Sequence, residues 1–141
     1  PMSVTDDEIR DILTETRVIA LVGWSPNPAR PSHGVARFLA AHGYRVIPVN
    51  PGQAGGMALG ERIRGSLSEI TESVDMIDIV RRADAIGPIV DEALERFPEL
   101  KTVWMQLGLF HSEAAAKARA RGVRVVENRC PAIEYPRLIG A

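Results

Sequence analysis

Short apolar runs alternate with segments of helical periodicity along this 141-residue chain, and that alternation restricts its fold more than any other feature. Runs that are brief, continuous and rich in branched side chains are typical of strands buried on both faces. Five such strands are predicted, at 17–23, 45–49, 74–80, 102–106 and 123–127. Helices are predicted at 5–15, 33–42, 83–97 and 112–121, and a short closing turn or helix within 131–141. Thr5 is the expected N-cap of the first helix and Ser112 that of the fourth. The glycines between 52 and 60 predict a loop, and one helical turn is expected at 66–70.

Alternating strands and helices favour a parallel sheet with helices on both faces. We therefore predict one α/β domain over 1–141, with a Rossmann-like, doubly wound, five-stranded parallel sheet. Right-handed crossovers lead us to expect the strand order 3-2-1-4-5. Pro48 in the second strand lacks an N–H group, which indicates an edge position or a gap in the hydrogen-bond ladder.

Composition excludes several classes of function. A formal net charge of −1 gives no global basic field for nucleic acid. No apolar run approaches the roughly 20 residues that span a bilayer, and the polar, acidic stretch 1–11 is unlike a signal peptide. One cysteine cannot form an internal disulfide framework, and it lies at no zinc-ligand spacing from the three histidines. Together these features favour a cytoplasmic protein without a metal site.

The loop after the first strand carries the residue types of a phosphate site. Gly23 permits a tight turn, Ser25 and Ser32 offer hydroxyl groups, and Arg30 offers charge-assisted hydrogen bonds. A helix that starts near Ser32 would point free N–H groups at an anion, at the end of the sheet where such folds bind ligands. The alternative is a proline-stiffened loop whose serines merely cap.

A nicotinamide dinucleotide is disfavoured. Its fingerprint, G-x-G-x-x-G, is broken here, because Ser25 stands where the second glycine belongs and Pro28 lies near the third. The second strand ends in Asn50 and Pro51 rather than in an acid that would hold the ribose hydroxyls. A Walker A loop is absent as well.

The later strand ends add further cleft candidates. Arg81 and Arg82 end the third strand, and alternation lets one of them face the cleft, although both could be ordinary helix-entry charges. Gln106, Gly108 and Asn128 are polar or small at strand ends and are the better candidates on that side.

Cys130 raises the hypothesis of a nucleophile. Arg129 beside it would favour the thiolate if the two side chains converge. The alternative, which we favour, is a small buried apolar residue.

Five segments at these strand ends, 23–32, 46–51, 74–81, 104–108 and 128–131, together resemble the small stand-alone CoA-binding domain proteins. The fold of that family is similar to the CoA-binding domain of the succinyl-CoA synthetase alpha subunit. The resemblance runs from about residue 17 to 138. Val80 and Ala83 depart from it, since the family often has phenylalanine and serine there.

The resemblance implies a CoA site. The turn at 23–25 and Ser32 would face the pyrophosphate, with Arg30 near a phosphate, and Asn50 and Pro51 would border the adenosine. The end of the third strand would line the cleft. The end of the fourth strand would lie toward the pantetheine, and the end of the fifth strand would close that side. The expected CoA-binding residues are Gly23, Trp24, Ser25, Arg30, Ser32, Asn50, Pro51, Val80, Arg81, Arg82, Gln106, Gly108, Asn128, Arg129 and Cys130.

We therefore expect a module that binds CoA or acyl-CoA without catalysis of its own and contacts neither nucleic acid nor membrane. Two alternatives stay open. One is a small enzyme that uses Cys130 for thiol exchange with CoA or as an acyl acceptor. The other is an accessory subunit of an acyl-CoA synthetase. A homo-oligomer is compatible with each of these.

Overall fold

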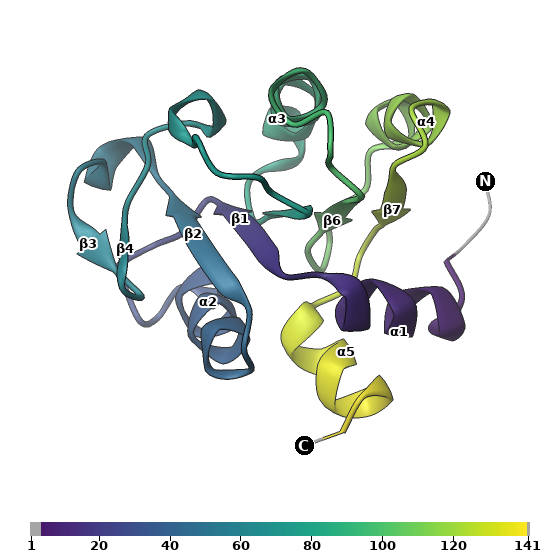
Figure 1. The fold of residues 1–141 in the computed structure, drawn as a ribbon, viewed down its shortest axis with the longest axis horizontal. Coiled ribbons are helices and arrows are strands. Elements are labelled where there is room, and N and C mark those ends of the chain that lie inside the picture. Colours follow the sequence, from purple (N-terminus) through teal and green to yellow (C-terminus); the bar gives the residue numbers. More distant parts are fainter. Residues whose placement is uncertain (1–3, 141) are drawn as a thin grey trace.

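The computed structural model describes residues 4–140 and shows an α/β fold built on a five-stranded parallel sheet (Figure 1). The strands of this sheet are β1 (Val18–Val22), β2 (Arg45–Val49), β5 (Met76–Ile79), β6 (Thr102–Met105) and β7 (Arg124–Val126). The helices are α1 (Asp6–Glu15), α2 (Pro31–Ala41), α3 (Ala83–Arg96), α4 (Ser112–Ala120) and α5 (Pro131–Leu138). Every predicted strand and helix is present within two residues of its expected bounds, and the predicted closing turn is α5.

The strands lie in the order β2-β1-β5-β6-β7, which is 2-1-3-4-5 in the numbering of the prediction. The predicted order 3-2-1-4-5 is therefore wrong, because it placed the second strand inside the sheet. β2 lies at the edge, and its Pro48 explains why. The Pro48 carbonyl faces outward and accepts the Arg64 N–H at 3.0 Å, so the missing N–H group also faces outward and costs no ladder hydrogen bond.

Helices cover both faces of the sheet, as predicted. Figure 1 shows α3 and α4 on one face and α1, α2 and α5 on the other. Alternate strand residues point to opposite faces. Ile77 and Val103 accordingly join the apolar layer under α3 and α4, whereas Leu21, Met76 and Trp104 join the layer under the other three helices.

The glycine-rich segment after β2 was predicted to be a loop and contains a small antiparallel hairpin, β3 (Met57–Ala58) with β4 (Glu61–Arg62). Between β4 and β5 the chain runs beside β2, where the Arg64 carbonyl accepts the Asn50 N–H at 2.9 Å. The Arg64 guanidinium pairs with Glu72 at 2.7 Å. This segment covers the edge of the sheet at β2. The helical turn predicted near 66–70 is a 3₁₀ turn at Leu67–Glu69.

Two helix starts test the capping predictions. Thr5 caps α1 as predicted and forms a complete capping box with Glu8. Ser112 does not cap α4. The cap is His111, whose Nδ1 accepts the Ala114 N–H at 3.0 Å, and Ser112 is the first helical residue. Within 4–140, the structure contains no helix of the length and apolarity that a membrane span needs.

Candidate functional site

A cleft of about 500 Å³ opens at the C-terminal edge of the sheet, where the loops after β1, β2 and β5 meet. These loops meet because β1 lies between β2 and β5. Nine of the fifteen predicted site residues line the cleft, together with Pro31, which the prediction missed. The lining residues are Gly23, Trp24, Ser25, Arg30, Pro31, Ser32, Asn50, Pro51, Val80 and Arg81.

Gly23 sets the shape of the cleft floor. Its φ is +99°, and a Cβ atom placed there would lie 2.2 Å from the Val80 carbonyl oxygen. Its N–H donates to the Val49 carbonyl at 3.1 Å. Only glycine allows the β1 turn to lie this close to both neighbouring strands. The tight turn predicted at Gly23 is thus present.

The turn itself is held by local hydrogen bonds. Ser25 Oγ accepts the Asn27 N–H at 3.1 Å, and Asn27 Oδ1 accepts the Ala29 N–H at 2.9 Å. Nδ1 of His33, in the first turn of α2, lies 2.9 Å from the Ser25 carbonyl oxygen. Ser25 therefore stabilises its own turn, but it does not cap α2, whose N-cap position is Arg30. Ser32 differs, because its buried side chain lies in the cleft wall and none of its atoms takes part in a side-chain hydrogen bond within 4–140.

The cleft is electropositive. Arg30 and Arg81 both line it, and no carboxylate is among the lining residues. α2 starts at the cleft, and no side chain caps its first turn, in contrast to α1. Uncapped N–H groups and the positive end of the helix dipole add to the two guanidinium charges. The arrangement suits an anion with several oxygen atoms.

Trp24 and Asn50 connect two of the loops. Asn50 Nδ2 donates to the Trp24 carbonyl at 2.7 Å, and Asn50 Oδ1 accepts the Gly52 N–H at 2.7 Å. The Asn50 side chain thus fixes the wall of the cleft. The Trp24 indole is buried in that wall, and its Nε1 has no partner within 4–140. A buried donor without a partner is costly, so this indole N–H carries an uncompensated desolvation penalty.

The other six predicted residues lie outside this cleft. Arg82 is largely exposed, with its Nε 3.4 Å from Asp84. The loops after β6 and β7 are joined to each other, since the Gly108 N–H donates to Asn128 Oδ1 at 2.8 Å. Gln106, Arg129 and Cys130 lie along the same two strand ends.

Arg129 and Cys130 do not converge in the way the nucleophile hypothesis requires. The Arg129 guanidinium lies 3.4 Å from the Glu134 carboxylate, and the Arg129 carbonyl accepts the Trp104 Nε1–H at 2.8 Å. Cys130 is buried in the layer under α5. It packs as the small apolar residue that we favoured.

Asp78 is a buried titratable residue that the site prediction missed. It lies in the middle of β5, is fully buried, and neither carboxylate oxygen has a partner within 4–140. Burial raises the pKa of Asp78 to about 8. Gln106 Oε1 is also buried without a partner. The signal that could have identified Asp78 from the sequence is an acidic residue inside an otherwise apolar strand.

The fold and the cleft define a class: a small Rossmann-like domain with an electropositive cleft at the C-terminal end of β1, between β2 and β5. Residues 17–136 match the model of a CoA binding domain family, and the chain belongs to that family. The predicted resemblance is confirmed.

Relatives extend over nearly the whole chain. An uncharacterised protein of Bacillus subtilis, YneT, is 35% identical over 123 residues, which cover 87% of this chain and 88% of that protein. A solved structure from Thermus thermophilus has a TM-score of 0.89 at 36% identity and covers 96% of this chain and 99% of its own. A hypothetical protein from Pyrococcus horikoshii has a TM-score of 0.88 at 36% identity, covering 97% and 94%.

Proposed function

We propose that this chain binds coenzyme A or an acyl-CoA in the cleft at the C-terminal edge of the sheet and catalyses no reaction by itself. The observation that carries the proposal is the cleft itself. Nine residues chosen from the sequence line one cavity, and the chain belongs to a CoA-binding family.

The phosphates are the part of CoA that the cleft fits best. The uncapped start of α2 offers N–H groups, Ser32 offers a hydroxyl, and Arg30 and Arg81 offer charge. Charge-assisted bonds from guanidinium groups to phosphate are among the strong hydrogen bonds in proteins. In this proposal the pyrophosphate lies against the α2 N-terminus, and the adenosine lies along Asn50 and Pro51.

The cleft is less suited to NAD. A dinucleotide site holds the ribose hydroxyls with a carboxylate at the end of the second strand, and Asn50 occupies that position here. Both polar ends of the Asn50 side chain are already engaged with backbone groups. The phosphorylated ribose of CoA meets no negative charge among the lining residues.

We place the pantetheine arm across the ends of β6 and β7, toward Gln106, Gly108 and Asn128. This direction follows from the cleft, which is bounded by β2 on one side and leaves the other strand ends for the rest of the ligand. The alternative of thiol exchange at Cys130 gains no support, because that side chain is buried and Arg129 is engaged by Glu134.

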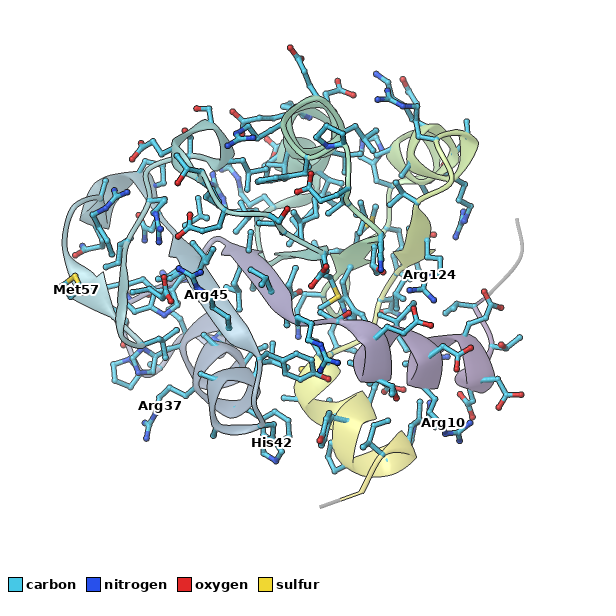
Figure 2. All side chains as sticks on the ribbon, in the orientation of Figure 1. Arg10, Arg37, His42, Arg45, Met57 and Arg124 are labelled. Atoms are coloured by element: carbon cyan, nitrogen blue, oxygen red, sulfur yellow. The ribbon has the colours of Figure 1, made fainter. Side chains whose placement is uncertain are left out.

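Isothermal titration with CoA, dephospho-CoA and NAD tests the proposal. CoA is expected to bind tightest. Arg30→Ala should weaken CoA at least about tenfold, because a lost charge-assisted hydrogen bond costs about 1.5–3 kcal/mol. The matched control is Arg37→Ala, on the same helix but directed away from the sheet (Figure 2). Equal or tighter NAD binding, or equal effects of the two substitutions, would contradict the proposal.

A further inference from the structure

A second, larger groove lies at the opposite edge of the sheet from β2. It has a volume of about 1440 Å³ and is lined by residues of β7, of α4 and of the start of α1. Figure 1 shows these three elements at the same side of the sheet. One face of α4 and the turns at its two ends form most of its wall. The α4 side of the lining comprises Phe110, His111, Ser112, Glu113, Ala116, Arg119, Ala120 and Gly122.

The exposed face of α4 is complementary to itself. Glu113 lies three residues before Ala116, and Arg119 lies three residues after it. When two such helices lie antiparallel with their Ala116 residues at the crossing point, each Glu113 faces the Arg119 of the other copy. Residues three apart lie on one side of a helix, so both charged pairs form at the same contact.

These charges are not used inside the protein. Lys117, on the same helix, pairs with Asp91 of α3 at 2.6 Å. Within 4–140, by contrast, Glu113 and Arg119 take part in no ion pair, although both line the groove. An unpaired acid and an unpaired base at symmetric positions are what a two-fold contact between copies would employ.

The turns at the ends of α4 follow the same symmetry. Phe110 lies six residues before Ala116 and is 61% exposed, which is unusual for a large aromatic side chain. Gly122 lies six residues after Ala116 and has no side chain. The antiparallel arrangement brings Phe110 of one copy against Gly122 of the other, where space is left for the ring.

The sheet edge beneath the groove supports the same conclusion. The Arg124 N–H donates to the Lys101 carbonyl, toward β6. Because successive strand residues face alternate sides, the backbone N–H and C=O of Val125 point toward the open edge. The edge at β2 is covered by the Arg64 segment, whereas within 4–140 no strand pairs with the outer side of β7. Proteins generally protect such edges, and a contact between two copies would cover this one.

α4 has nine residues and is therefore about 13 Å long, so the proposed contact runs along about two and a half helical turns. We propose that this groove receives α4 of a second copy of this chain, so that the protein forms an isologous two-fold dimer through α4 and the β7 edge. This inference does not rest on the CoA proposal, because no residue lines both the groove and the cleft.

Sedimentation equilibrium of the full chain tests the proposal. The unmodified protein is expected to be a dimer. Glu113→Arg and Arg119→Glu should each shift it toward the monomer, because each sets like charges face to face. The double variant Glu113→Arg/Arg119→Glu should restore the dimer, since opposite charges again face each other. Glu95→Arg, an exposed reversal on α3, is the matched control and should leave the dimer unchanged.

Circular dichroism establishes that each variant retains the fold. A monomeric unmodified protein at the highest soluble concentration would overturn the proposal. So would a dimer that is insensitive to the single reversals, or a double variant that stays as monomeric as the single ones.

Discussion

Replacing Asp78 with asparagine tests whether this carboxyl group is held neutral inside the sheet. Asp78 is fully buried and has no hydrogen-bond partner within 4–140, and burial raises its pKa to about 8 from the ordinary value of 3.8. The folded protein therefore binds a proton that the unfolded chain releases. Stability contributed by this protonated group is complete below the ordinary pKa and is lost as the pH rises toward the folded-state pKa.

The magnitude follows from the two pKa values. Between about pH 4 and pH 8, the free energy of unfolding should fall by about 1.4 kcal/mol for each pH unit because of this group alone. The accumulated cost at about pH 7 is on the order of 4 kcal/mol. An asparagine side chain carries no titratable proton, so Asp78→Asn should remove this slope and gain relative stability as the pH rises.

Urea unfolding at several values between about pH 5 and pH 8 measures the effect. The quantity of interest is the difference between Asp78→Asn and the unmodified protein, since the titrations of all other groups cancel in it. That difference should grow steadily in favour of the asparagine variant as the pH rises. Parallel curves, with a constant difference, would show that Asp78 is ionised in the folded state and refute the reasoning.

Three further predictions concern stability and local dynamics. Gly23→Ala should lower the free energy of unfolding by at least about 1–3 kcal/mol in urea unfolding, because of the strained φ and the clash with Val80. Gly34→Ala in α2 is the control. A Cβ atom there has nothing within 4 Å, so this substitution should leave the free energy of unfolding unchanged or raise it. Thr5→Ala should cost about 1 kcal/mol in the same assay through loss of the capping box; no change would mean that the cap contributes nothing. Glu134→Gln removes a buried partner of two arginines and should speed amide exchange in α5, with unaltered exchange counting against that role.

The sequence predicted every main element because strand and helix periodicities are local properties. It did not predict the strand order, which depends on which strands pair. Pro48 contained the missing information, since a residue without an N–H group belongs at an edge. The cap of α4 was misassigned because serine is a common cap, whereas the Nδ1 of His111 fills that role only in one tautomer and orientation.

The part of the candidate site that lies directly after strands could be predicted from the sequence, because the strands themselves could be. Residues that directly follow β1, β2 and β5 come together in the cleft because parallel strands end at the same side of the sheet. The pairing of Arg129 with Glu134 could not be foreseen, because it depends on how α5 returns over the sheet. The isolation of Asp78 likewise depends on which groups surround it in three dimensions.

Helix α1 lies outside the segment that matches the family, yet the fold depends on it. α1 lies before residue 17, yet it contributes Ile9, Ile12 and Leu13 to the apolar layer beneath the sheet. An ion pair joins it to the other end of the chain, where Asp6 lies 2.8 Å from Arg137. A fragment trimmed to the matched segment would expose that layer to water, so expression of 17–136 alone should yield aggregates rather than a smaller functional unit.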